Sequence, residues 1–136
     1  MQEPNNCRYI DMSLPADKDM MLLVRLTASG ALARSGVTID RMDDFKTAIE
    51  EACSCLISQI AAPGRIALRF DIGDRCAQFT CSCADGCPTG MVVDPAELEV
   101  ASLILESLVD KSEIEVHRGI IHSINLTMAL PNGGEM

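Results

Sequence analysis

The stretch DDFKTAIEEACSCLIS, residues 43–58, decides the fold. Apolar side chains recur three or four residues apart through it and just beyond its ends, at Met42, Phe45, Ile49, Cys53, Leu56 and Ile60. This spacing lines one face of an α-helix, which we expect over residues 39–61. Thr38 is expected to cap the helix, because its hydroxyl can accept a hydrogen bond from a free N–H group of the first turn. Pro63 and Gly64 are expected to end it.

Two further helices are predicted, one on each side of this stretch. Residues 17–35 are rich in helix-forming side chains and are followed by Gly36, a residue that often lies just past a helix end. Asp94 and Pro95 open the other helix, over residues 95–110, with an N-cap and a proline at the first helical position.

The remaining segments have the pattern of strands. Ile66, Leu68 and Phe70 alternate with polar residues, which is typical of a half-buried strand. Strands are expected over residues 7–14, 66–72 and 77–83, near 114–116 and over 120–130. Helices and strands are segregated enough to form one sheet covered on one face by helices, a two-layer α/β sandwich. We expect a single domain spanning residues 1–136.

Composition limits the classes of function. The chain has 136 residues, of which 48% are hydrophobic and only 3% aromatic, so aliphatic side chains, methionine and cysteine must build the core. The net charge of −9 disfavours nucleic acid as a partner and suits a basic protein surface. The sequence has no signal segment and no apolar run of membrane-spanning length, so we expect a cytoplasmic protein without a membrane partner.

Seven cysteines are an odd number, which argues against a disulfide framework in a chain without an export signal. Cys76, Cys81, Cys83 and Cys87 lie close in sequence, and four thiolates can bind zinc. The usual pair of CxxC motifs is absent, however, so we favour packing of these cysteines in the core and expect no metal. A metal-binding or redox-sensing role is the alternative.

Three segments resemble one protein family: LLVRLTASGALARSG, IDRMDDFKTAIEEACSCLI and LILESLVDKSEI. They are similar to the bacterial anti-sigma factor serine-protein kinases, which belong with the histidine kinase, Hsp90 and gyrase ATPase domains (the Bergerat, or GHKL, fold). The resemblance extends over about residues 14–130. It implies a mixed sheet under a layer of helices. It also implies a sigma factor and an anti-anti-sigma protein of the STAS type as partners, the latter phosphorylated on serine with ATP and magnesium.

The resemblance assigns roles within the second helix. The family carries Glu-x-x-x-Asn there, with the Glu helping to activate the attacking group and the Asn holding magnesium. Glu51 matches the Glu, and Cys55 occupies the Asn position. A neutral thiol is a poor substitute, because magnesium is a hard ion that prefers oxygen ligands.

The rest of the implied nucleotide site also departs from the family. Asp85 can be aligned with the adenine-binding Asp, but the glycine spacing after it differs, and another alignment places Cys83 there. Glu99 and Ala101 fall at two glycines that let backbone N–H groups approach the phosphates. The mobile lid is shortened to little more than GCPTGMVVDPAE. A carboxylate at position 99 would repel a triphosphate at a helix N-terminus.

Arg25 matches an arginine in the family's partner-binding first helix, and guanidinium groups suit pairing with partner carboxylates. The alternative is an arginine whose stem packs at the helix edge while its charge reaches water. In the same way, Glu51 is either a catalytic base or, as we favour, a solvated surface acid. Glu50 is expected to be surface charge only.

These observations favour a regulatory protein that binds a sigma factor or an anti-anti-sigma partner, as one chain or as a homodimer. We expect little or no ATP-dependent activity and no cofactor. The alternative is an active ATP-dependent anti-sigma factor serine/threonine-protein kinase that uses ATP and Mg²⁺. A thiol or metal sensor on the same fold is the third interpretation.

Overall fold

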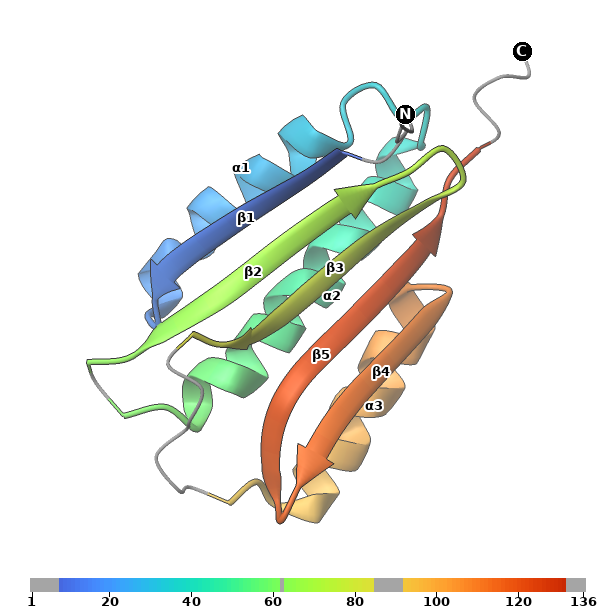
Figure 1. Cartoon of the computed structure of the whole chain (residues 1–136). Helices are drawn as coiled ribbons and strands as arrows, with labels where there is room; N and C mark the ends of the chain where they lie inside the picture. Colours follow the sequence, from blue (N-terminus) through green and yellow to red (C-terminus); the bar gives the residue numbers. More distant parts are fainter. Residues whose placement is uncertain (1–7, 62, 85–91, 132–136) are drawn as a thin grey trace, which may run out of the picture.

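The computed structural model describes residues 8–61, 63–84 and 92–131. Five strands form one sheet in the order β1-β2-β3-β5-β4. Their bounds are β1 Arg8–Pro15, β2 Arg65–Ile72, β3 Cys76–Cys83, β4 Lys111–His117 and β5 Ile120–Ala129. Figure 1 looks onto the face of the sheet that the helices leave open.

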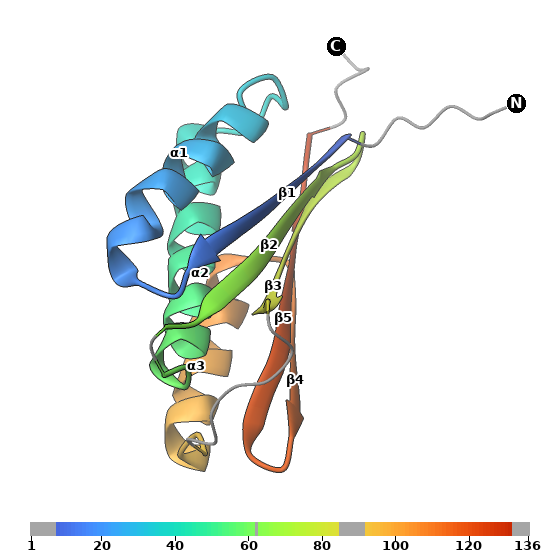
Figure 2. The same cartoon turned by 60° about the vertical axis from the view of Figure 1, so that its left-hand side comes forward.

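The helices of the described ranges pack on the opposite face. Their bounds are α1 Met21–Ala31, α2 Ile39–Ser58 and α3 Pro95–Leu108, and a short 3-10 helix, η1 Lys18–Met20, precedes α1. In Figure 2 the helices form one layer and the strands the other. The predicted two-layer α/β sandwich is therefore confirmed.

The sheet departs from the expectation in one respect. The resemblance implied a mixed sheet, but β1–β2, β2–β3, β3–β5 and β4–β5 are all antiparallel pairs. Hairpins account for two of the four pairs, β2–β3 and β4–β5, since a short turn can only join antiparallel neighbours. In the β4–β5 hairpin, Arg118 and Gly119 have φ angles of 57° and 78°, the left-handed pair that two-residue hairpin turns require.

Helix α2 lies under the middle of the sheet. The Thr38 hydroxyl accepts a hydrogen bond from the Arg41 N–H at 3.1 Å, as an N-cap should. Its buried residues are Phe45, Ala48, Ile49, Ala52, Cys53 and Leu56. The helix ends at Ser58 rather than near residue 61, because the Gln59 side chain turns into the core and the Gln59 N–H closes a tighter turn onto the Leu56 carbonyl at 3.1 Å.

The other two helices are also shorter than predicted. The helix expected over residues 17–35 is divided into η1 and α1, and α1 ends one residue after Gly30, a poor helix former. Helix α3 ends at Leu108 instead of residue 110. Its predicted N-cap is confirmed, since the Asp94 carboxylate accepts a hydrogen bond from the Ala96 N–H at 3.0 Å.

The core lies between the two layers. Ile66, Leu68 and Phe70 of β2 are buried, as the alternation predicted. Phe70 and Phe79 of the neighbouring strand place their ring centroids 5.1 Å apart, within the range of favourable aromatic pairs. Cys53 and Cys81 are fully buried, which confirms core packing for these two cysteines.

In the described part of the chain, none of the helices combines the length and the apolar character needed to cross a lipid bilayer.

Candidate functional site

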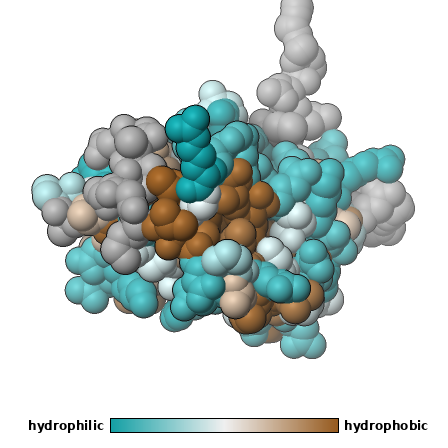
Figure 3. Space-filling model, turned by 90° about the horizontal axis from the view of Figure 1, so that it is seen from below, coloured by the Kyte–Doolittle hydropathy of each residue, from teal (hydrophilic) through white to brown (hydrophobic). Residues whose placement is uncertain are grey.

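A cavity of about 420 Å³ lies between the second half of α2 and the first half of α3. Its lining is formed by Glu51, Ser54, Cys55, Ser58, Val93, Ala96, Glu97, Leu98, Val100, Ala101 and Ile121. Figure 3 views this end of the molecule, where apolar side chains gather among polar ones. The volume and the mainly apolar lining with a few polar groups are typical of a ligand pocket.

Glu51 and Cys55 lie one helical turn apart on the α2 side of the cavity. The Cys55 thiol donates a hydrogen bond to Glu51 Oε2, with 3.8 Å between the heavy atoms. Burial, and then the neighbouring Glu51 carboxylate, raise the pKa of Cys55 from 9.0 to about 11. The thiol is therefore neutral at physiological pH, and as a neutral thiol it is neither a good nucleophile nor a good metal ligand.

The α3 side of the cavity carries a charge that the sequence did not assign to it. Glu97 lines the cavity, whereas Glu99 is exposed and lies outside the lining. Ala101 lies in the lining, as the resemblance implied for its position. Residue 97 could have been found from the sequence, because it and Ala101 are four residues apart and share a helix face.

A buried amide joins the helix layer to the sheet near this cavity. Gln59 is 3% exposed and is buried beside the core. Its Nε2 donates to the Ile121 carbonyl at 2.6 Å, and its Oε1 accepts from the Ile121 N–H at 3.1 Å. Ile121 also lines the cavity, so this pair of hydrogen bonds fixes one wall. No sequence pattern indicates this pairing, since the two residues are 62 positions apart.

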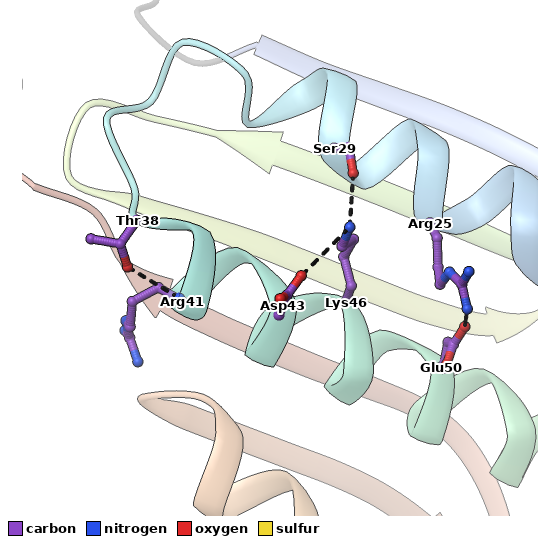
Figure 4. Close-up of polar contacts among 7 residues, drawn as sticks. All are labelled: Arg25, Ser29, Thr38, Arg41, Asp43, Lys46 and Glu50. Carbon is purple, nitrogen blue, oxygen red and sulfur yellow. Dashed lines mark hydrogen bonds and ion pairs between the residues drawn. The ribbon is translucent and has the colours of Figure 1, made fainter.

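Arg25 lies on α1, on the side that faces α2. Its guanidinium pairs with Glu50 of α2 at 2.8 Å, and the two side chains are 47% and 33% exposed. Lys46 adds contacts to Ser29 at 3.2 Å and to Asp43 at 3.8 Å, so polar contacts join α1 to α2 (Figure 4). Glu50 is thus not a lone surface charge, and Arg25 already holds a carboxylate within its own chain.

The remaining predicted site residues fall in two classes. Asp85 and Cys87 lie outside the described residues. Cys76 and Cys83 are half-buried on β3, and within the described ranges no three His, Cys, Asp or Glu side chains are arranged to hold a metal ion.

Searches against known proteins returned relatives over most of the chain. The serine-protein kinase RsbW of Bacillus subtilis is 27% identical over 133 residues, covering 85% of this chain and 83% of its own length. RsbW of Staphylococcus epidermidis is 37% identical over 70 residues, covering 48% of this chain and 44% of its own length. The crystal structure of the RsbU and RsbW domains of a Mycobacterium tuberculosis protein matches with a TM-score of 0.68 and 19% identity. That match covers 90% of this chain and 32% of the solved one.

The chain resembles the RsbW serine-protein kinases over most of its length. This confirms the resemblance on which the sequence interpretation depends, and the match to the solved chain shows that the two share a fold. No family model matches the chain. The match spans about a third of the solved Mycobacterium chain and most of the length of the Bacillus RsbW.

The RsbW resemblance implies an ATP and magnesium site, and the cavity between α2 and α3 lies where that site is expected. Its described lining does not fit the ligand. It holds the two carboxylates Glu51 and Glu97, a neutral thiol at Cys55 and no basic residue. Magnesium requires several oxygen ligands in octahedral geometry, and the two negative charges oppose a triphosphate. At the α3 N-terminus, the Ala96 N–H is already bonded to Asp94.

Proposed function

We propose that this protein is an anti-sigma-factor-like regulator that captures a sigma factor or an anti-anti-sigma partner, with little or no ATP-dependent activity and no nucleotide cofactor. The lining of the α2–α3 cavity carries the proposal. A site with two carboxylates and a protonated thiol, and without a basic residue among those described, is suited neither to the triphosphate nor to its metal. Capture of a partner needs neither.

A second candidate function is an active serine-protein kinase. Two observations favour it. The relatives that align over most of the chain are named as such kinases, and Glu51, which matches the family's activating Glu, faces the cavity. If the protein is such a kinase, side chains other than those that the family uses would hold ATP and Mg²⁺.

Arg25 is our candidate for partner contact. It lies on the outer part of α1 with Leu22 and Leu26, each 60% exposed. An exposed apolar helix face with a basic residue in it is a plausible anchor for a protein partner. Because Arg25 is paired with Glu50 in the free chain, a partner carboxylate would have to replace or join Glu50.

The test uses the purified protein with each sigma factor and each STAS-type protein of the source bacterium. Size-exclusion chromatography without nucleotide measures complex formation, and labelled ATP with Mg²⁺ measures phosphate transfer. We expect a stable complex and no labelled partner. Transfer of label to a partner serine would support the kinase instead, and failure to bind any of these proteins would reject capture.

The matched variants are Arg25→Ala and Arg41→Ala. Both remove an arginine from a surface ion pair, because Arg41 pairs with Asp110 at 2.6 Å, away from α1. Truncating an arginine that pairs with a desolvated partner carboxylate typically costs about 2–5 kcal/mol of binding. Only Arg25→Ala should weaken the complex to this extent. Equal affinities in the two variants would remove Arg25 from the contact surface.

A further inference from the structure

Helix α3 has two apolar faces. Ala101 and Leu105 point into the core and are buried. Val100, Leu103 and Ile104 lie on the outer side, and are 55%, 60% and 36% exposed. Their spacing of three and four residues makes them a continuous stripe. A helix that is apolar on both sides is typical of one that is covered on both sides, and the described residues leave this outer stripe between 36% and 60% exposed.

The outer stripe is continuous with the α2–α3 cavity. Val100 belongs to both, because it lines the cavity and is more than half exposed. Val92, 65% exposed, precedes the lining residue Val93. Stripe and cavity together form one apolar surface, which we call the α2–α3 groove. Figure 3 shows apolar side chains gathered at the end of the molecule where the cavity lies.

Negative charge borders the α2–α3 groove. Helix α3 carries Glu97, Glu99 and Glu106 and contains no Lys or Arg. On the α2 side, residues 50–58 contain two glutamates and no basic residue. The exposed Arg118 lies at one end of the groove, next to Gly119, whose carbonyl accepts from the Val93 N–H at 2.8 Å. Along the two helices the border is negative, and an apolar surface with such a border favours an occupant that is apolar on one side and basic at its edges.

We propose that the α2–α3 groove docks an amphipathic, basic helix of another protein. The apolar side of that helix would cover Leu103 and Ile104 and place one large side chain in the cavity beside Val100. Its Lys or Arg residues would pair with the α3 glutamates. This is the helix-in-groove mode of recognition, in which anchors spaced three, four and seven residues apart fill an apolar groove.

Charge argues against the other occupants. A second copy of this chain would bring a further net charge of −9 to an already acidic surface. No Lys or Arg occurs in the segments outside the described ranges, which are residues 1–6, 62, 85–91 and 132–136 together with residue 7, apart from Arg8 at the start of β1. These segments therefore cannot supply a basic helix. A small molecule in the cavity would leave Leu103 uncovered. The α2–α3 groove is also separate from Arg25 and α1, so this inference does not depend on the proposed function.

The probe is a fluorescently labelled peptide of Leu and Lys with the same length as α3, 14 residues. Its leucines are placed at helical spacing on one side. Two controls accompany it: a scrambled peptide of the same composition, and the amphipathic peptide with Glu in place of Lys. Fluorescence anisotropy with the full chain should show binding of the amphipathic basic peptide and at least about tenfold weaker binding of both controls.

Two pairs of variants locate the contact. Leu103→Ser and Leu26→Ser remove equally exposed leucines, 60% each, from α3 and α1. A double variant, Glu99→Gln with Glu106→Gln, removes negative charge from α3. Its control, Glu113→Gln, removes negative charge from β4. We expect the α3 variants to weaken binding about fivefold or more and the α1 and β4 variants to leave it unchanged. All these positions are exposed, so folding should persist, which circular dichroism will check.

Three outcomes would overturn the proposal. Equal binding of the scrambled peptide would mean that only net charge attracts it. Equal weakening by Leu103→Ser and Leu26→Ser, or weakening by neither, would place the contact elsewhere. A homodimer in native mass spectrometry that Leu103→Ser dissociates would assign the α2–α3 groove to a second copy of the chain.

Discussion

Gln59 is the residue on which the attachment of α2 to the sheet depends most directly. A buried amide costs free energy unless its hydrogen bonds are made, and here one side chain satisfies both backbone groups of Ile121. β5 pairs with both β3 and β4, but its pairing with β3 begins only at Ser123. At Ile121, the Gln59 side chain bonds to the backbone N–H and carbonyl groups instead.

The first prediction concerns this amide. Gln59→Ala should lower the free energy of unfolding by at least about 2 kcal/mol, because two buried backbone groups lose their partner and each costs about 1–3 kcal/mol. Urea denaturation measures the change. Gln78→Ala, at an exposed position of β3, is the control and should cost less than about 1 kcal/mol. Similar losses in both variants would show that the Ile121 contacts contribute nothing special.

The second prediction concerns Cys55 and pH. The folded state holds the thiol proton more tightly, with a pKa of about 11 against 9.0 for an ordinary cysteine. Between pH 9 and 11 the unfolded chain therefore binds fewer protons, so the stability that is full below pH 9 is lost as the pH rises towards 11. Denaturation at pH 8, 9, 10 and 11 should show a smaller decline for Cys55→Ala than for the parent. Parallel declines would contradict the buried, proton-bound thiol.

The sequence could identify residues whose role is local. Thr38 and Asp94 were recognised as caps because a cap is defined by its neighbours in the chain. The pairing of Arg25 with Glu50 and of Gln59 with Ile121 could not be predicted, because it depends on how helices pack. Glu97 rather than Glu99 lines the cavity because it shares a helix face with Ala101, four residues on, a spacing that the sequence contains although the family alignment pointed to position 99.

At the scale of elements, the N-caps fix where α2 and α3 begin. A helix that began one residue later would not rotate, but its first turn would lose a bonded N–H group. Thr38 and Asp94 prevent this by accepting from Arg41 and Ala96. The helix ends were marked less closely, because Gly36 and Pro63 lie five residues past Ala31 and Ser58, the last residues of α1 and α2.

The third prediction compares a Thr→Ala substitution at the N-cap of α2 with the same substitution inside α1. Thr38→Ala removes the α2 cap and should cost about 1 kcal/mol of stability. Thr27→Ala acts in the middle of α1, where the hydroxyl only bonds back to the Leu23 carbonyl at 2.9 Å. Alanine is the better helix former there, so this variant should be neutral or more stable by up to about 0.5 kcal/mol. Thermal melts of both variants measure the contrast, and a loss of the same size at Thr27 would refute it.

For the molecule as a whole, charge and shape favour protein partners of two kinds. The α1 face offers apolar side chains around Arg25, while the α2–α3 groove offers apolar side chains among glutamates. The net charge of −9 strengthens attraction to any basic partner and weakens self-association. The order of elements and the two-layer fold could be predicted because periodicity and turn residues encode them locally. The antiparallel pairing of β5 beside β3 could not, because no local signal orders strands that are distant in the chain.

The fourth prediction concerns nucleotide. ATP with Mg²⁺ at about 1 mM should not raise the melting temperature, because a ligand stabilises the folded state appreciably only when its concentration exceeds its dissociation constant. Restoring the family's metal ligand with Cys55→Asn should not rescue binding. The Glu51 and Glu97 carboxylates remain in the lining, and Asp94 still occupies the Ala96 N–H.

Adenosine, which lacks the phosphates, separates the two reasons for exclusion. If charge alone excludes ATP, adenosine should bind the 420 Å³ cavity more tightly than ATP does. Glu97→Gln should then reduce the difference in affinity between the two ligands. If the cavity has also lost the shape of an adenine site, neither ligand will bind to any variant. A clear rise in melting temperature for Cys55→Asn with Mg²⁺-ATP, and none for the parent, would show that the missing metal ligand was the main defect. The acidic lining would then be a lesser obstacle than we infer.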